Sequence, residues 1–217
     1  MQNRRNTYFL LTLFFFICSF LGKEQAVTLP VCLLLIDYFV GRDFHNRELW
    51  VEKISFFSLS LLGGILTILS QGSEGEELIY SLDYRILFAC YTTFEYMVKS
   101  FLPVNLSYIY PFPVLPEESI PLRLWFYPII VLTGSGMLFV YRKNKIVMFS
   151  ILFLILHIAV ALHLISISRF TIVADRYLYL GCIGISFLTV WIACHFIQSL
   201  SDKWKKLFVS IYFALYL

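Results

Sequence analysis

The stretch FLGKEQAVTLP, residues 20–30, places Lys23 and Glu24 side by side between two strongly apolar runs. A charge inside a membrane helix costs about 3 kcal/mol or more unless it is paired or hydrated, so such charges mark a functional site by default. The alternative is that both side chains lie at a helix end and extend to the membrane surface. Pro30 follows shortly afterwards, and a helix break near it would free backbone groups and open a polar pocket.

The composition of the whole chain is that of a membrane protein. Of its 217 residues, 59% are hydrophobic and 14% are charged, whereas soluble domains average roughly 25% charged residues. Together with a mean hydropathy of +0.79, this predicts an all-α, polytopic helical membrane protein. Basic clusters are expected at cytoplasmic loop ends, and no nucleic-acid partner is expected.

The spacing of the cysteines does not indicate a metal or disulfide site, and the sequence contains no known catalytic motif. The five cysteines all lie in apolar stretches without CxxC or Cys/His spacing, so we expect no disulfide framework and no metal site. Because His157 and His163 are six residues apart, they fall on different helical faces, and interhelical hydrogen bonding is the favoured role for them. Gly134-Ser135-Gly136 favours close packing of helices.

Several apolar runs approach the ~20 residues that a membrane-spanning helix needs. They cover residues 7–22, 26–40, 54–70, 123–141, 146–165 and 177–199, and a last run, 207–217, is still apolar when the sequence stops. The first two runs are short, which requires a thin patch of bilayer or a polar group held below the membrane surface. Because the last run has no polar end, we expect the chain to be part of a longer protein.

Charges in the loops predict the orientation of these spans. The basic clusters at 142–145 and 202–206 are expected in the cytoplasm, and the acidic segment 71–82, which lacks Lys and Arg, outside. Counting crossings then requires that 84–102 does not span, so we expect it to be an interfacial or re-entrant helix on the outer face. The unusual charges all fall on that face: Lys23, Glu24, Arg85, Glu95, Lys99, Asp175 and Arg176.

Two outer segments carry further candidates. The planar guanidinium of Arg176 suits a phosphate, and Asp175 would orient Arg176 or contact a polar substrate. The alternative for this pair is a helix-start acid followed by an interfacial arginine among membrane-surface tyrosines. The segment 103–122 is rich in Pro and Tyr, so it predicts a structured loop that is either an ordered connection or the wall of an outer cleft.

Three blocks occur in an order that resembles a known family. They are GKEQAVTLPVCLLLIDYFVG at 22–41, FLPVNLSYIYPFP at 101–113 and VADRYLYLGCIG at 173–184. Together they resemble the membrane domain of the transmembrane and tetratricopeptide-repeat (TMTC) family and its bacterial relatives. The resemblance covers most of residues 7–200.

The resemblance implies part of a C-type glycosyltransferase membrane domain similar to the protein O-mannosyltransferases. Such enzymes transfer a sugar from a polyprenyl-phosphate carrier to an acceptor on the outer face. By this resemblance Lys23 and Arg176 bind the donor phosphate, and Glu24 and Asp175 support them. The implied partners are membrane lipid, the lipid-linked polyprenyl-phosphate sugar as donor substrate, and a protein or glycan acceptor; the sequence identifies no cofactor beyond this donor. The implied location is a multi-pass position in a bacterial inner membrane, with the active face outward.

The resemblance also implies a cleft wall and a missing base. Asn105 and Tyr110 would line the outer cleft. The family's catalytic acid normally lies upstream of the region matched here, so hexosyltransferase activity is expected of the full-length protein, and this chain alone is expected to be inactive. Gly181-Cys182 stands where relatives often have Pro-Ser. The alternative function is a non-enzymatic membrane anchor for an external tetratricopeptide-repeat domain.

Overall fold

The computed structural model describes residues 2–71, 80–104, 106–115, 118–162, 164 and 171–199. Every regular element among these residues is helical, and their one β-type contact is an isolated bridge between Tyr110 and Val173. The expected all-α class is therefore confirmed. The apolar run at 207–217 and the basic cluster at 202–206 lie outside the described residues.

The described residues form long helices joined by short 3₁₀ turns. The α-helices are α1 (Gln2–Gly22), α2 (Leu29–Val40), α3 (Arg47–Gln71), α4 (Leu82–Phe101), α5 (Phe126–Val140), α6 (Lys145–Ile158) and α7 (Leu178–Ser199), and the 3₁₀ turns are η1 (Glu24–Thr28), η2 (Leu122–Trp125), η3 (Ala159–Ala161) and η4 (Asp175–Tyr177). The helix of the 54–70 run begins earlier than expected, at Arg47. The helix of the 146–165 run ends earlier, because its α-helical part stops at Ile158.

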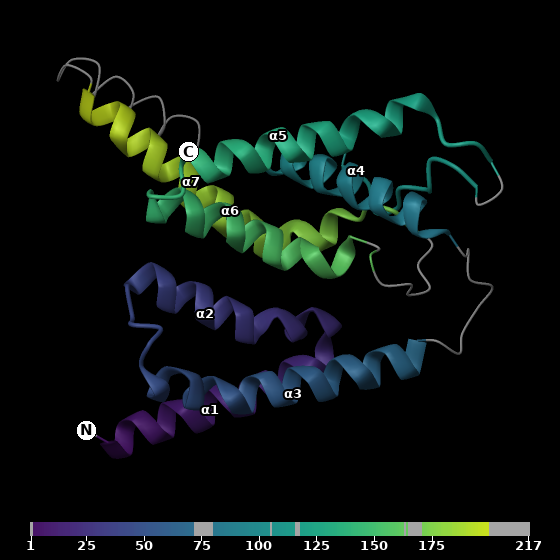
Figure 1. The fold of residues 1–217 in the computed structure, drawn as a ribbon. Helices are drawn as coiled ribbons and strands as arrows, with labels where there is room; N and C mark the ends of the chain where they lie inside the picture. The colour runs from purple at the N-terminus through teal and green to yellow at the C-terminus, as the bar shows by residue number, and fades with distance from the viewer. Residues whose placement is uncertain are drawn as a thin grey trace, which may run out of the picture.

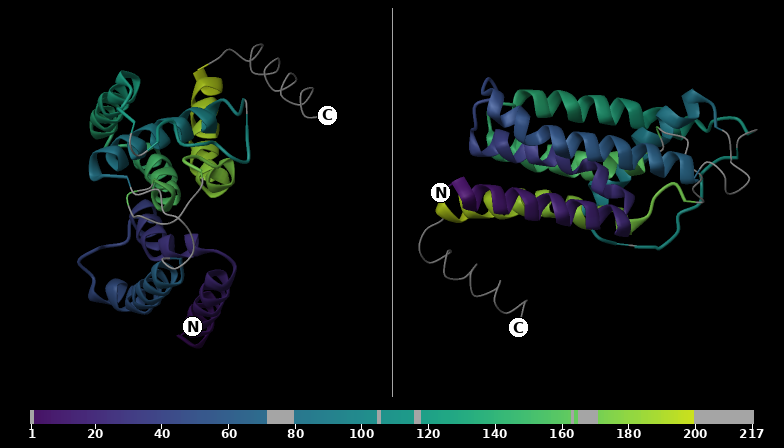
Figure 2. Two further views of the ribbon diagram at one scale, coloured as in Figure 1. Left: turned by 90° about the vertical axis from the view of Figure 1, so that its right-hand side faces the viewer. Right: turned by 90° about the horizontal axis from the view of Figure 1, so that it is seen from below.

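The long helices lie side by side and alternate in direction, whereas α4 is tilted across them (Figures 1 and 2). One end of the assembly carries the turn η1 and the beginning of α7, and we call it the Lys23 end. The opposite end carries the α2–α3 and α5–α6 connections, and we call it the Arg42 end. The order in space runs from α1 and α3 through α2 to α6 and α7, then to α4 and α5 (Figure 1).

Among the described residues, three helical stretches are long and apolar enough to cross a membrane: Arg47–Ser70, Leu122–Val140 and Asp175–Gln198. Three shorter apolar helices accompany them, at Asn6–Gly22, Gln25–Val40 and Lys145–Ala161. Large apolar side chains are exposed along these helices, and α5 buries none of its residues. In water such a surface would be unfavourable, because burial of apolar area is the main stabilising term in folding.

Glycines allow α6 and α7 to pack closely. A Cβ added at Gly184 would lie 2.5 Å from the carbonyl oxygen of Ser150, and one added at Gly181 would lie 2.7 Å from Leu154 Cδ1. Small residues at such positions let two helices approach each other in a membrane protein. Gly134 and Gly136 have no described atom within 4 Å of such a Cβ, so the expectation that they pack against a helix is wrong for the described residues.

Aromatic side chains join the two halves of the fold. The ring of Phe39 on α2 lies 4.7 Å from that of Phe149 on α6 and 5.7 Å from that of Phe187 on α7, measured between centroids. At these separations aromatic pairs are favourable. A larger cluster, near the Lys23 end, contains Phe88, Tyr96 and Leu154, all fully buried.

An ion-pair network joins α2 to α3 at the Arg42 end. The buried carboxylate of Asp37 lies 2.9 Å from Lys53 Nζ and 3.1 Å from Arg42 Nη1. Arg42 also reaches Glu52 at 3.0 Å, and the hydrogen bond to Glu52, assisted by the charge of Asp37, raises the pKa of the Arg42 guanidinium. Lys53 is only 7% exposed, so these carboxylates take the place of water as partners of its ammonium group.

We expect Asp37→Ala to destabilise the protein by about 3–5 kcal/mol, because it leaves the buried Lys53 with only the Glu52 carboxylate, 3.8 Å from its Nζ. The measurement is chemical unfolding in detergent micelles. Asp43→Ala is the matched control: this acid lies in the same connection but is exposed, and its removal should change the stability by less than about 0.5 kcal/mol. Equal losses in both variants would contradict the assignment.

Candidate functional site

The helical backbone is interrupted at Lys23. Helix α1 ends at Gly22, and Lys23 is extended (φ −161°, ψ 133°) before η1 begins. Pro30 lies in the first turn of α2, where a missing N–H costs no hydrogen bond. The expected helix break near Pro30 is therefore present, a few residues before the proline itself.

Two hydroxyl groups satisfy backbone carbonyls at this break. Ser60 Oγ on α3 donates to the carbonyl of Val27 at 2.6 Å, and Thr28 Oγ1 donates to the carbonyl of Gln25 at 2.9 Å. Unpaired carbonyls are expensive in an apolar environment, so irregular backbone there needs such donors. The Ser60 bond also fixes the position of η1 against α3.

The interruption brings Lys23 to the start of α7. Its Nζ lies 5.2 Å from the ring centroid of Tyr177 and 5.0 Å from that of Tyr179. The guanidinium carbon of Arg176 lies 5.2 Å from the same Tyr177 ring and 4.9 Å from the ring of Tyr108. Distances below about 6 Å are in the range of cation–π attraction. The two predicted phosphate-binding cations thus share one aromatic neighbour.

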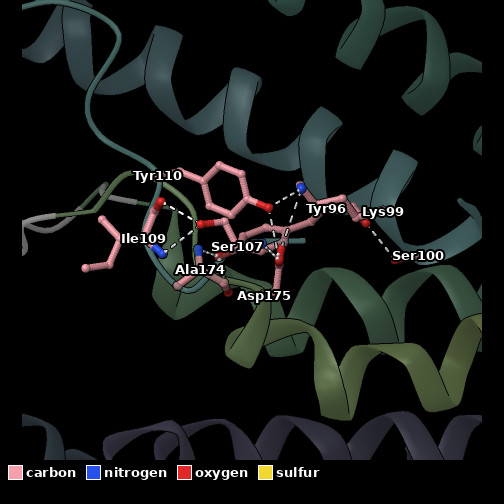
Figure 3. A network of polar contacts seen from close by, with 8 residues as sticks. All are labelled: Tyr96, Lys99, Ser100, Ser107, Ile109, Tyr110, Ala174 and Asp175. Atoms are coloured by element: carbon pink, nitrogen blue, oxygen red, sulfur yellow. Dashed lines mark hydrogen bonds and ion pairs between the residues drawn. The ribbon is translucent and has the colours of Figure 1, made fainter. Parts of the chain in front are cut away.

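The described contacts of Asp175 are with groups other than Arg176. Its Oδ2 accepts hydrogen bonds from the backbone N–H of Ser107 at 2.7 Å and from the hydroxyl of Tyr110 at 3.0 Å (Figure 3). Its Oδ1 lies 3.7 Å from Lys99 Nζ, which also donates to the Tyr110 hydroxyl at 2.6 Å. Among the described side chains no carboxylate forms an ion pair with Arg176. The carboxylate therefore holds the 106–115 loop against the start of α7.

Backbone contacts strengthen the same junction. Ile172 N donates to the carbonyl of Tyr110 at 3.0 Å. The buried hydroxyl of Tyr96 donates to the carbonyl of Ala174 at 3.2 Å and accepts from the N–H of Ala174 at 3.1 Å. Helix α4, the 106–115 loop and the segment before α7 consequently form one hydrogen-bonded unit.

The structure places only one of the three remaining predicted side chains. Tyr110 belongs to the Asp175 network, half-buried, and joins the loop to α4 and α7. Asn105 and the side chain of Glu24 lie outside the described residues, so their predicted roles stay predictions. Sequence reasoning placed Lys99 on the same face but missed its contact with Asp175. The only local signal was a charge in an apolar helix, which does not identify its partner.

A cavity of about 340 Å³ lies beside the interrupted backbone. Lys23 and Tyr179 line it together with Gln25 from η1 and His157 from α6. The described residues contain no group of three or more His, Cys, Asp or Glu side chains placed to hold a metal ion. The polar character of this site therefore comes from amide, imidazole, hydroxyl and ammonium groups.

Comparison of the chain with protein-family models, with curated proteins and with solved structures gives no match.

We expect Tyr110→Phe to loosen the 106–115 loop, because it removes the hydroxyl that joins Lys99 to Asp175. The loss of a hydrogen bond to a charged group, about 1.5–3 kcal/mol, should accelerate hydrogen exchange of Ser107 and Ile172 amides by about tenfold or more. Tyr141→Phe, at an exposed tyrosine of the Arg42 end, is the control and should leave these rates unchanged. Unaltered exchange in Tyr110→Phe would show that the hydroxyl does not hold the loop.

Proposed function

We propose that this chain is a multi-pass membrane domain that binds the phosphate of a polyprenyl-phosphate sugar at its Lys23 end, as part of a glycosyltransferase of the TMTC type. The observation that carries the proposal is the meeting of Lys23 and Arg176 at the ring of Tyr177, although about 150 residues of sequence separate them. The resemblance of the three sequence blocks motivates the sugar carrier.

The surroundings of the two cations suit an anion. No carboxylate among the described side chains pairs with either of them, and the nearest aromatic faces attract cations only weakly compared with a phosphate. Lys23 is half-buried and Arg176 exposed, so a ligand has access to both. In a low-dielectric setting two such cations bind a phosphate more strongly than they would in water.

The exposed apolar helices support the membrane placement. Three of the described helices are long enough to span, and the turn η1, which follows Lys23, lies at the same end as the beginning of α7, which follows Asp175 (Figure 1). A prenyl chain would lie along this apolar surface while its phosphate contacts the cations. We place this end on the outer face of a bacterial inner membrane, because the basic 142–145 cluster lies at the opposite end.

In the proposed reaction, the cations stabilise charge on the lipid phosphate as it leaves the anomeric carbon. A carboxylate must take the proton of the acceptor hydroxyl, and we propose that a residue outside this chain supplies it. Lys23 and Arg176 thus contribute binding and leaving-group stabilisation. Hexosyl transfer to a protein or glycan acceptor is proposed for the full-length protein only.

Binding of a short-chain prenyl phosphate to the purified chain in lipid nanodiscs tests the proposal. We expect Lys23→Met and Arg176→Met each to weaken binding by about tenfold or more, since each removes a charge-assisted contact of about 1.5–3 kcal/mol. Lys143→Met removes an exposed cation at the Arg42 end and should bind like the wild type.

Two results would contradict the proposal. Absence of prenyl-phosphate binding to the wild-type chain would favour the anchor function. Unchanged binding in both Lys23→Met and Arg176→Met would place the phosphate elsewhere. All variants should insert into membranes like the wild type, because neither side chain contributes to the buried core.

A further inference from the structure

We infer that the cavity beside η1 binds the sugar of the lipid-linked donor, with Gln25 and His157 as the residues that recognise its hydroxyl groups. This inference rests on the proposed function, because Lys23, at the rim of the same cavity, is one of the two proposed phosphate ligands. It adds a second part to that site: a neutral polar pocket next to a cationic rim.

Gln25 is the first reason. Its side chain is 5% exposed, and neither Nε2 nor Oε1 has a hydrogen-bond partner among the described residues. A buried polar group without a partner costs about 1–3 kcal/mol, so native structures rarely keep one without a cause. The amide offers two N–H donors and one acceptor, which complements a hydroxyl group, since a hydroxyl both donates and accepts.

His157 is the second reason. Its Nδ1 lies 2.8 Å from the carbonyl oxygen of Phe153, and a carbonyl only accepts, so Nδ1 carries a proton. In the neutral ring the other nitrogen, Nε2, is then an acceptor. No described residue hydrogen-bonds Nε2, and the ring lines the cavity. The pocket thus presents a second acceptor from a different helix.

The size and chemistry of the cavity select the ligand class. A volume of about 340 Å³ is far more than the ~30 Å³ that one water occupies in the liquid, and it falls at the small end of the roughly 300–1,000 Å³ of ligand pockets. Besides the Lys23 cation, the described polar lining is neutral, so a cationic group inside the cavity would lack a counter-charge and an anionic group would have Lys23 alone. A neutral, hydroxyl-rich group attached to a phosphate matches both the neutral polar lining of the cavity and the Lys23 cation.

The break in the helix lets Lys23 and Gln25 line the same cavity. In a continuous α-helix, side chains two positions apart point to nearly opposite sides. The Ser60 hydrogen bond to Val27 instead holds η1 in place. Gln25 and Lys23 therefore line one cavity although they are only two residues apart.

The test compares two probes in nanodiscs: a short-chain prenyl phosphate and the same lipid bearing mannose, with glucose and galactose versions measured alongside. We expect the wild type to bind one or more of the glycosylated probes about tenfold more tightly than the bare phosphate, equivalent to about 1.4 kcal/mol. Gln25→Leu and His157→Phe should each abolish this preference and leave binding of the bare phosphate within about twofold of wild type.

Matched controls are available at the Arg42 end. Gln198→Leu and His195→Phe repeat both substitutions at exposed positions and should keep the wild-type preference. A second readout is thermal stability in detergent: Gln25→Leu removes an unpartnered amide, so its unfolding temperature should equal or exceed that of the wild type. A lower unfolding temperature would show that the amide has a structural partner, which would overturn the inference.

The outcomes separate the two proposals. Equal wild-type affinity for bare and glycosylated probes, with loss of both in Lys23→Met, would leave the phosphate site standing and overturn the inference that the cavity binds the sugar. A preference that survives in Gln25→Leu and His157→Phe would place the sugar elsewhere and overturn the inference. No binding of either probe would overturn the proposed function and this inference together.

Discussion

The arrangement of the Lys23 end depends on the hydrogen bond from Ser60 to the carbonyl of Val27. An interrupted helix leaves backbone carbonyls without partners, and in an apolar environment each one must find a donor. Ser60 supplies this donor from α3, and Thr28 supplies a second one within η1. With those carbonyls satisfied, the chain can leave the helical path at Lys23, pack against α7 and open a cavity beside α6.

The opposite end is organised on a different principle. There the buried Asp37 carboxylate holds Lys53 and Arg42, and these charges join α2 to α3. At the Lys23 end the carboxylate of Asp175 is equally occupied, because Lys99, Tyr110 and the Ser107 amide all contact it. The acids are thus used for structure at both ends. The cations Lys23 and Arg176 contact aromatic rings instead, and the proposed anion site rests on this difference.

Local patterns predicted the helices well. Apolar runs of about 15–25 residues became helices because their backbone groups pair internally, and the proline and charges at 23–30 correctly indicated a break. The sequence did not predict which side chains pair with the charged residues. Asp175 contacts Ser107 and Tyr110, some 65 residues away, and Lys53 meets Asp37 across a connection whose turn includes Gly41 at φ 82°. Such pairings depend on how helices pack, which no local period encodes.

Helix packing also determines which glycines contact another helix and where the cavity forms. Gly181 and Gly184 contact α6 closely, whereas Gly134 and Gly136 do not contact any described helix, although all four look alike in the sequence. Gln25 gave no signal at all, because a glutamine beside two charges is unremarkable. Its importance follows only from burial without a partner next to a cavity.

Cysteine cross-linking measures whether the turn at Lys23 lies against the start of α7. In a variant without the five native cysteines, Lys23→Cys and Tyr179→Cys are joined by a short bifunctional thiol reagent in native membranes, and linked peptides are identified by mass spectrometry. We expect efficient cross-linking of this pair and none between Arg42→Cys and Tyr179→Cys, which lie at opposite ends (Figure 1). Absence of the first cross-link, or equal yields for both pairs, would contradict the account.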